Sequence, residues 1–314
     1  MDRRQFIRTI GTAILGGAAG ATWAEDLVER STTGMRTRNL GRTGHRSSLV
    51  TFAGYAVHGV SQAEANRAVA EAIDAGVNHF DVAPSYGDAE KHLGPALEGK
   101  RDRVFLGCKT LERQKAGAAK ELRASLKTLR TDHFDLYQVH GLDKPEDLDT
   151  VLGPGGAMEA FLEARDAGLI RFIGITGHRP AVHLDAVRRF PFDTVMVPVN
   201  FVLEHHHQFT VELLAELARR RIGVIAIKAL AARPWAKDEQ REYPGCWYRP
   251  IDDDREVELA LRFTLSQQVA TAVPPADVRL VRKAIAAGKR YRRLDQAGEA
   301  KLAALAEELK PIFG

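Results

Sequence analysis

The feature of this sequence that most restricts its fold is a regular alternation of short apolar runs with longer amphipathic segments. The apolar runs, which predict strands, lie at 48–53, 78–82, 103–108, 134–139, 170–175, 193–199, 222–227 and 269–273. Helical periodicity is clear between several of them, at 61–76, 116–130, 157–168, 209–221 and 254–267. Eight such units within roughly 250 residues are typical of an α/β chain closed into a (β/α)8 TIM barrel.

An open, doubly wound sheet would show the same alternation and has to be weighed against the barrel. In dinucleotide-binding sheets of that kind, a Gly-x-Gly-x-x-Gly turn follows a strand. No predicted strand of this sequence is followed by such a turn, which favours the barrel. Residues 36–314 show neither an internal repeat nor a break in composition, so we expect a single domain. The stretch 36–46 carries Gly41 and Gly44 and predicts a small hairpin that closes the bottom of the barrel.

The composition agrees with a globular chain that has a large core. Of 314 residues, 45% are hydrophobic and 27% are charged, and the net charge of +4 is spread along the chain rather than clustered. Without a basic cluster, nucleic acid is not an expected partner. Cys108 and Cys246 are too few for a disulfide framework, although one bridge between them stays an alternative. Cys108 is expected to be a small core residue rather than a nucleophile.

The first 24 residues, MDRRQFIRTIGTAILGGAAGATWA, do not follow the barrel pattern. Arg3 and Arg4 precede a weakly apolar run of glycine and alanine that is too short for a stable membrane span. The order Arg-Arg-x-Phe-Ile resembles the recognition box of a twin-arginine (Tat) export signal, with an ordinary Sec signal or a retained anchor as alternatives. The resemblance implies the Tat translocase as a partner and a periplasmic or extracytoplasmic location. The expected division is a signal peptide over 1–24, a linker over 25–35 and the barrel over 36–314.

Polar side chains stand where three predicted core strands end. Asp81 ends the second strand and Tyr86 lies in its loop, while Lys109 and His140 end the third and fourth strands. Barrel active sites lie at the C-terminal ends of the strands, so closure would bring the four together. A lysine beside a carboxylate stays charged, and its ammonium is expected to lower the pKa of a nearby phenol. Such a phenol can donate a proton to a developing alkoxide, which suits carbonyl reduction.

Over roughly residues 36–311, the chain resembles the aldo-keto reductase superfamily. The most specific match is FDVAPSYG, which is close to the family's Phe-Asp-Thr-Ala-x-x-Tyr-Gly. The resemblance implies that Tyr86 is the general acid/base and that Lys109 tunes it. It also implies that Asp81 holds Lys109 and that His140 orients the substrate oxygen. The implied cofactor is NADP, with NAD possible, and the implied substrate is a small carbonyl or alcohol.

The resemblance also implies a cofactor site near GLIRFIGITGH and GVIAIKAL, where the match to the family is weaker. Met196 stands where a glutamine is usual, and Ile227 stands where an aromatic ring usually stacks on nicotinamide. The implied cofactor-binding residues are Thr176, Gly177, Asn200, Lys228, Leu230, Arg279 and Arg282. On a helix, Arg279 lies on one face with both Arg282 and Lys283, so two cations are expected to converge on one 2′-phosphate.

These departures keep a second hypothesis open. It is a barrel that retains the four catalytic residues but has lost nicotinamide turnover. Such a barrel would be a binding protein, or an isomerase or lyase acting on a sugar-like substrate. Export would favour this hypothesis, since free NADPH is scarce outside the cytoplasm.

Two further segments raise questions that the sequence leaves open or answers only in part. His205, His206 and His207 are consecutive, and neighbours on a helix point about 100° apart, so they would chelate a metal poorly. We therefore expect no metal there, but a polar loop leading into a helix that starts at Thr210. The segment 233–250 is long for a barrel loop, and it is either a lid over the substrate or a surface loop.

Overall fold

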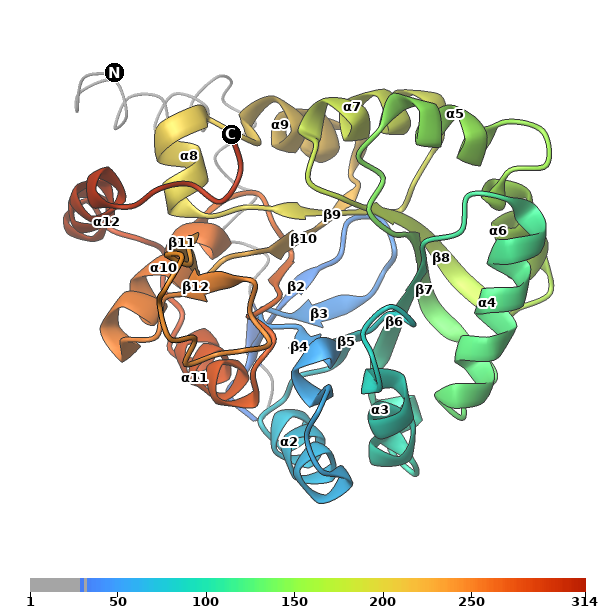
Figure 1. Ribbon diagram of the computed structural model, residues 1–314, viewed down its shortest axis with the longest axis horizontal. Coiled ribbons are helices and arrows are strands. Elements are labelled where there is room, and N and C mark those ends of the chain that lie inside the picture. Colours follow the sequence, from blue (N-terminus) through green and yellow to red (C-terminus); the bar gives the residue numbers. More distant parts are fainter. Residues whose placement is uncertain (1–28, 31–32) are drawn as a thin grey trace.

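The computed structural model describes residues 29–30 and 33–314, and its centre is one curled sheet of eight parallel strands (Figure 1). The strands are β4 (Phe52–Ala53), β5 (His79–Asp81), β6 (Phe105–Thr110), β7 (Phe134–Val139), β8 (Ile170–Thr176), β9 (Thr194–Pro198), β10 (Gly223–Ile227) and β13 (Thr271–Ala272). Each strand pairs with the next in this order. The sheet closes where Val50 bridges Ala272 and the amide of Thr51 donates to the Ala272 carbonyl at 3.0 Å. The predicted barrel is therefore confirmed.

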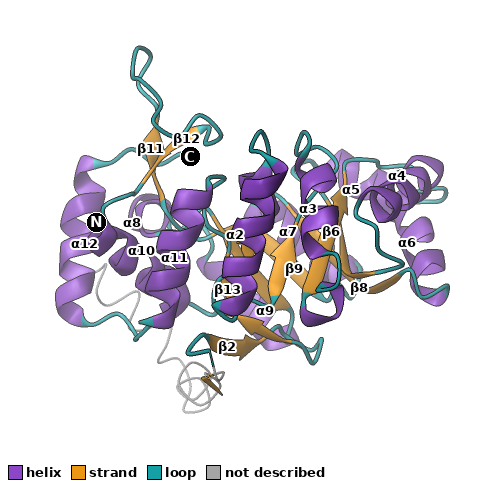
Figure 2. Ribbon diagram, turned by 90° about the horizontal axis from the view of Figure 1, so that it is seen from below, coloured by secondary structure: helices purple, strands orange, loops and turns teal. Residues whose placement is uncertain are grey.

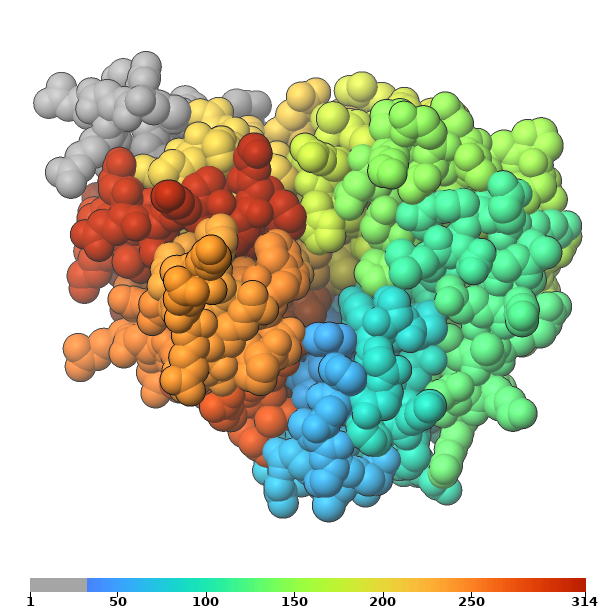
Figure 3. All heavy atoms as spheres, in the orientation of Figure 1, coloured from blue at the N-terminus to red at the C-terminus, as the bar shows by residue number. Residues whose placement is uncertain are grey.

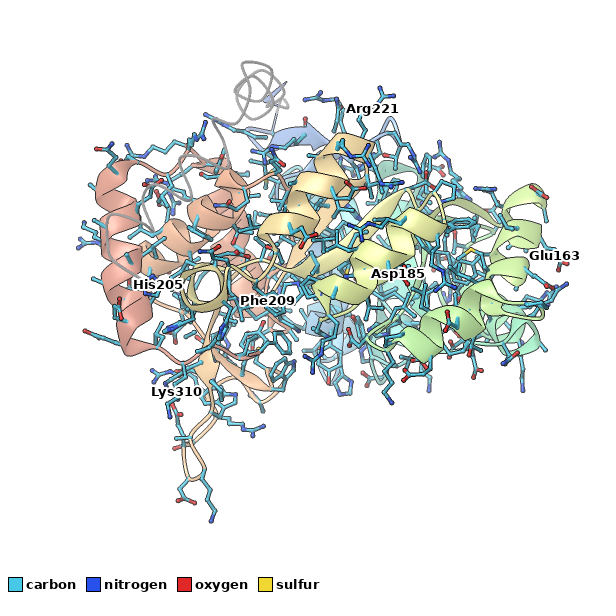
Figure 4. All side chains as sticks on the ribbon, turned by 90° about the horizontal axis from the view of Figure 1, so that it is seen from above. Glu163, Asp185, His205, Phe209, Arg221 and Lys310 are labelled. Atoms are coloured by element: carbon cyan, nitrogen blue, oxygen red, sulfur yellow. The ribbon has the colours of Figure 1, made fainter. Side chains whose placement is uncertain are left out.

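Helices surround this sheet. They are α2 (Gln62–Asp74), α3 (Ala89–Leu97), α4 (Lys115–Thr128), α5 (Pro145–Leu152), α6 (Ala157–Asp166), α7 (Pro180–Arg189), α8 (Phe201–His207), α9 (Val211–Arg220), α10 (Asp254–Ser266), α11 (Val278–Lys289) and α12 (Gln296–Glu308), with short 3-10 helices at Gly54–Val57 and Arg101–Arg103. Figure 4 shows α9 between Phe209, nearer the C-terminal ends of the strands, and Arg221 at the opposite end, so this helix runs antiparallel to the strands that it connects.

The residues at the two ends of α2, the first helix between barrel strands, determine where this helix begins and ends. The Ser61 side chain accepts a hydrogen bond from the Glu64 amide and so caps the start of α2. Gly76 follows the helix with a φ of +92°, a conformation that glycine adopts without the steric cost of a side chain. The chain is thereby turned directly into β5.

A hairpin closes the bottom of the barrel, as predicted. Strands β2 (Arg36–Asn39) and β3 (Arg46–Ser48) are antiparallel, and Figure 2 shows β2 on the opposite side of the molecule from β11 and β12. Leu40 at the end of β2 is fully buried and packs among residues from the starts of the barrel strands. Burying a leucine in this way contributes about 1.5–3 kcal/mol. A β-carbon on Gly41 would lie only 2.2 Å from the Gly223 nitrogen, so a larger residue would displace the hairpin.

Two described parts of the predicted linker contact the folded body. Strand β1 (Glu29–Arg30) pairs with β2, and Met35 is fully buried in the core. The predicted signal peptide at 1–24 lies outside the described residues.

Alternation along β6 decides which of its side chains face the barrel interior. On β6, Phe105 packs inside the barrel while Leu106 and Cys108 pack against the surrounding helices. Lys109 therefore faces inward, because side chains of a strand alternate between its two sides. Both cysteines are buried and free, so the alternative of a disulfide between them is excluded.

The segment 233–250 forms an ordered hairpin rather than an irregular loop. Strand β11 (Ala231–Pro234) pairs antiparallel with β12 (Tyr248–Pro250), and the hairpin projects from the C-terminal face of the barrel (Figure 2). The indole of Trp235 donates to the Cys246 carbonyl at 2.7 Å and ties the two arms together. The base of this hairpin borders the site described below.

The three consecutive histidines lie in the last turn of α8, so the predicted loop is wrong. His205 contacts the Glu307 carboxylate at 3.1 Å, and His206 contacts the Ala306 carbonyl at 2.9 Å. These contacts hold α8 against α12. Within the described part of the chain, no group of three or more His, Cys, Asp or Glu residues could hold a metal ion. No helix there is both long and apolar enough to cross a bilayer.

Candidate active site

The C-terminal ends of β5, β6 and β7 bring the four predicted catalytic side chains together. Figure 3 shows a hollow at the centre of this face, between the first segments of the barrel (blue and cyan) and the hairpin region (orange). Asp81 and Lys109 lie at the ends of β5 and β6, and His140 directly follows β7. Tyr86 comes from the turn after β5. The predicted grouping is what the structure shows.

Lys109 and Asp81 form a buried ion pair at the base of this group. The exposed fraction is 0% for Lys109 and 3% for Asp81. The ammonium contacts Asp81 Oδ2 and also donates to the Val82 carbonyl at 3.2 Å. Burial alone would lower the pKa of Lys109, but the Asp81 carboxylate and the Tyr86 phenol together outweigh this effect and raise that pKa. Lys109 is therefore a fixed positive charge at neutral pH.

A third residue, Gln138, contacts this ion pair. It was missed in the sequence analysis. Its Nε2 donates to Asp81 Oδ1 at 2.9 Å and so holds the carboxylate oxygen that Lys109 leaves free. The available signal was its position two residues before His140, because residues at i and i+2 of a strand share one side. A β-carbon on Gly107 would lie 3.2 Å from Asp81 Oδ1, so the intervening strand leaves little room beside this carboxylate.

Tyr86 lies between this charge and His140. The Lys109 ammonium is 4.8 Å from the centre of the Tyr86 ring, and the His140 ring lies edge-on at 5.7 Å. Burial raises the pKa of the Tyr86 phenol, and the Lys109 charge opposes this rise only in part. The predicted net lowering of this pKa is therefore wrong. Near neutral pH the phenol keeps its proton, which is the form that a proton donor needs.

His140 is neutral in this environment. Burial, and then the Lys109 charge, lower the pKa of His140 to about 3. Its Nδ1 lies 3.4 Å from the Ser85 hydroxyl. A neutral imidazole can donate one hydrogen bond without delivering its proton. The site thus presents a protonated phenol and a neutral imidazole side by side, which suits an oxygen that gains negative charge during reaction.

The residues predicted to contact the cofactor at the ends of β8, β9 and β10 differ in whether their side chains are free to do so. Thr176 ends β8, where its hydroxyl accepts from the Gly141 amide at 3.2 Å, and Gly177 follows at the rim. The amide of Asn200 is committed to the protein itself, because it accepts from the Leu203 nitrogen and donates to the Lys228 carbonyl. The Leu230 side chain is likewise fully buried. In this structure, neither Asn200 nor Leu230 offers a free side chain to a ligand.

Lys228 lies at the mouth of the site, directly after β10. Its backbone has a φ of +63°, which is uncommon for a residue with a side chain. Its ammonium lies 5.2 Å from the Trp247 ring and 5.3 Å from the Tyr248 ring, at the base of the hairpin. Burial lowers the pKa of Lys228 to about 8.

The structure does not bring the cations of α11 together, and their predicted convergence on one phosphate is wrong. Arg279 binds Asp277 Oδ2 at 2.9 Å. Arg282 instead binds Glu71 of α2 at 2.8 Å, and Lys283 binds a carboxylate at the start of α10 at 2.6 Å. The sequence could not show these partners, because Glu71 is 211 residues away along the chain.

Comparison with known proteins gave one family and a consistent set of relatives. The Aldo/keto reductase family model matches residues 50–248. The chain is 30% identical to the "Uncharacterized oxidoreductase YqkF" of Bacillus subtilis (strain 168) over 206 residues, 61% of this chain and 64% of that protein. It is 30% identical to the L-galactose dehydrogenase of Arabidopsis thaliana over 216 residues, 63% of this chain and 66% of that protein. These alignments thus span just under two thirds of each relative.

A solved structure supports the same relationship. The holo form of an aldo-keto reductase from Bacillus halodurans matches with a TM-score of 0.67 and 25% sequence identity, over 86% of this chain and 96% of that one. The likeness therefore extends over the barrel as a whole.

Proposed function

The chain belongs to the aldo/keto reductase family, and on this premise we propose that it transfers hydride between NADP(H) and a carbonyl or alcohol substrate. The observation that carries the proposal is the geometry at the strand ends. The buried Lys109–Asp81 ion pair lies directly below the Tyr86 ring, and the neutral His140 lies beside it. A protein that only bound sugars would have no need of a buried positive charge beside this phenol and imidazole.

In the direction of reduction, the chain's own residues bind and protonate the substrate oxygen. NADP(H), when bound, supplies the hydride. Tyr86 donates its proton as negative charge develops on that oxygen, and the Lys109 charge stabilises the phenolate that remains. His140 donates its N–H to the same oxygen and orients it. Asp81 and Gln138 keep Lys109 in position.

The rim of the barrel fits a nicotinamide cofactor in part. Thr176 and Gly177 would lie at the carboxamide, and the partly exposed Ile227 side chain would replace the usual aromatic ring. Lys228 supplies a positive charge beside them. The commitment of the Asn200 amide to α8 favours the second candidate, a barrel acting without nicotinamide as a binding protein, isomerase or lyase. Native mass spectrometry of the purified protein with NADPH separates the two, because only the first forms a stoichiometric complex.

Arg279 is our candidate for contact with the 2′-phosphate of NADP(H). Its guanidinium is half exposed and stacks 4.5 Å above the Tyr243 ring, and its hydrogen-bond partners within the described part of the chain are its near neighbour Asp277 and the Glu242 carbonyl. A planar guanidinium suits bidentate binding of phosphate. Loss of one charge-assisted contact costs about 1.5–3 kcal/mol, so Arg279→Ala should weaken NADPH binding by about one to two powers of ten. Binding of NADH, which lacks the phosphate, should change little.

The matched control for this prediction is Arg282→Ala. Arg282 is bound by carboxylates of α2, so its loss should leave NADPH binding close to that of the wild type. Fluorescence titration of both cofactors against the three proteins measures the difference. Equal weakening of NADPH and NADH by Arg279→Ala would contradict the assignment.

We also propose that the N-terminal segment directs export through the Tat translocase to the periplasm or another extracytoplasmic location. The proposal rests on the Arg3-Arg4 pair and the residues that follow it. Replacing both arginines with lysine keeps the charge but removes the guanidinium groups. The folded precursor should then accumulate in the cytoplasm, as cell fractionation and immunoblotting would show. Export of the double-lysine form at the wild-type rate would refute the twin-arginine assignment.

A further inference from the structure

The basic side chains around His140 differ in whether a carboxylate contacts them. Besides burial, four of them lower the pKa of His140, and they are Lys109, His178, Arg113 and Lys228. Three have a carboxylate partner, in the pairs Lys109–Asp81, His178–Asp143 and Arg113–Asp147. Lys228 is the exception, because no carboxylate contacts its ammonium among residues 29–30 and 33–314. The mouth of the site therefore carries one positive charge without a counter-ion in the described chain.

The backbone of Lys228 adopts a strained, left-handed conformation. A non-glycine residue in the left-handed region is strained and persists only where its surroundings impose that conformation. Here the Lys228 carbonyl accepts hydrogen bonds from the Ala231 amide at 2.9 Å and from Asn200 Nδ2 at 3.1 Å. The first bond closes the turn from β10 into β11, and the second ties this turn to Asn200, which follows β9.

Aromatic rings define the surroundings of this ammonium. Trp247 and Tyr248 lie beside it, and Phe313 near the C-terminus lies 5.6 Å from the Trp247 ring. Trp247 keeps 49% of its surface exposed, although it is large and apolar. A half-buried cation beside an exposed indole offers a ligand both an ionic contact and an apolar wall.

We propose that Lys228 binds a carboxylate of the substrate, so that the preferred substrates are carbonyl compounds that also carry an acid group. The proposal rests on the reductase function proposed above. A cation partly removed from water gains more from an oxyanion than an exposed one does, because the local dielectric constant is lower. Lys228 directly follows β10, so it lies at the same C-terminal end of the barrel as Lys109 and His140, where the reacting carbonyl would bind.

The diphosphate of the cofactor carries similar oxyanions, so the test has to separate the two sources. Its probes are 4-carboxybenzaldehyde and methyl 4-formylbenzoate, which share the reacting aldehyde and differ in charge. Wild-type protein should prefer the acid in kcat/KM by about tenfold or more, the scale of one charge-assisted contact. In Lys228→Met the ratio of acid to ester should fall to about one, and Lys228→Arg should retain most of it. Lys237→Met, an exposed lysine of the same hairpin, is the control and should keep the wild-type ratio.

Titration of NADPH into the same variants completes the comparison. If Lys228→Met weakens NADPH binding and leaves the ratio of acid to ester unchanged, the anion is the diphosphate and the substrate assignment is overturned. A wild-type ratio near one overturns it as well.

Failure of the reductase proposal would be visible separately. If neither aldehyde supports oxidation of NADPH, that proposal fails, and the carboxylate site is then tested by binding alone. Tryptophan fluorescence should report saturable binding of 4-carboxybenzaldehyde that is stronger than binding of the ester and is lost in Lys228→Met. Equal binding of acid and ester would refute the carboxylate site, whatever the protein catalyses.

Discussion

Tyr86→Phe should fold normally and lose turnover by about a hundredfold or more, which is the scale of lost general acid–base catalysis. The substitution removes the hydroxyl and keeps the ring that contacts Lys109 and His140. Because the proton donor is lost while the site keeps its shape, we expect the fall in kcat rather than a comparable rise in KM. Steady-state kinetics on any carbonyl that the wild type reduces measures this change, with circular dichroism to verify the fold.

The control is Tyr137→Phe, the same chemical change on β7. Tyr137 is fully buried between the barrel and its helices, on the other side of the strand from Gln138 and His140. It should retain wild-type turnover. A Tyr86→Phe enzyme that works at the wild-type rate would remove this phenol from the mechanism.

Asp81→Asn should destabilise the protein by about 3–5 kcal/mol, because it leaves the Lys109 ammonium buried without a counter-charge. Lys109 is fully buried, where its ammonium contacts the Asp81 carboxylate and donates to the Val82 carbonyl at 3.2 Å. The double variant Asp81→Asn with Lys109→Met removes both charges and should recover much of the loss. Urea unfolding of the single and double variants measures the difference.

The comparison of these two variants separates charge from packing. If the double variant is as unstable as Asp81→Asn alone, the cost arises from packing at this position and not from the unpaired charge. A loss below about 1 kcal/mol in the single variant would show that water reaches Lys109, since an exposed ion pair contributes no more than that.

The sequence was sufficient to predict the barrel and the grouping of four polar side chains at its strand ends, because the signals for both are local. Apolar runs alternate with helical segments because each strand and each helix has to bury its own apolar side, so the architecture is repeated along the chain. Asp81, Lys109 and His140 were found because the end of a strand is a position that the sequence itself marks. The alternation of side chains along β7 also places Gln138 on the same side as His140, but our prediction did not include this residue.

The tertiary structure alone decided the charge environment of these residues. The helix α8 was predicted as a loop because its three histidines carry no apolar period, and it is covered by α12 from a distant part of the chain. Arg282 meets α2 rather than a phosphate, and burial reverses the expected shift of the Tyr86 pKa. The pKa of Lys228 is lowered because the chain folds to bury this side chain beside the rings of Trp247 and Tyr248. Electrostatic free energies depend on the separation of groups in space and on their exclusion from water, and neither quantity can be read from their order along the chain.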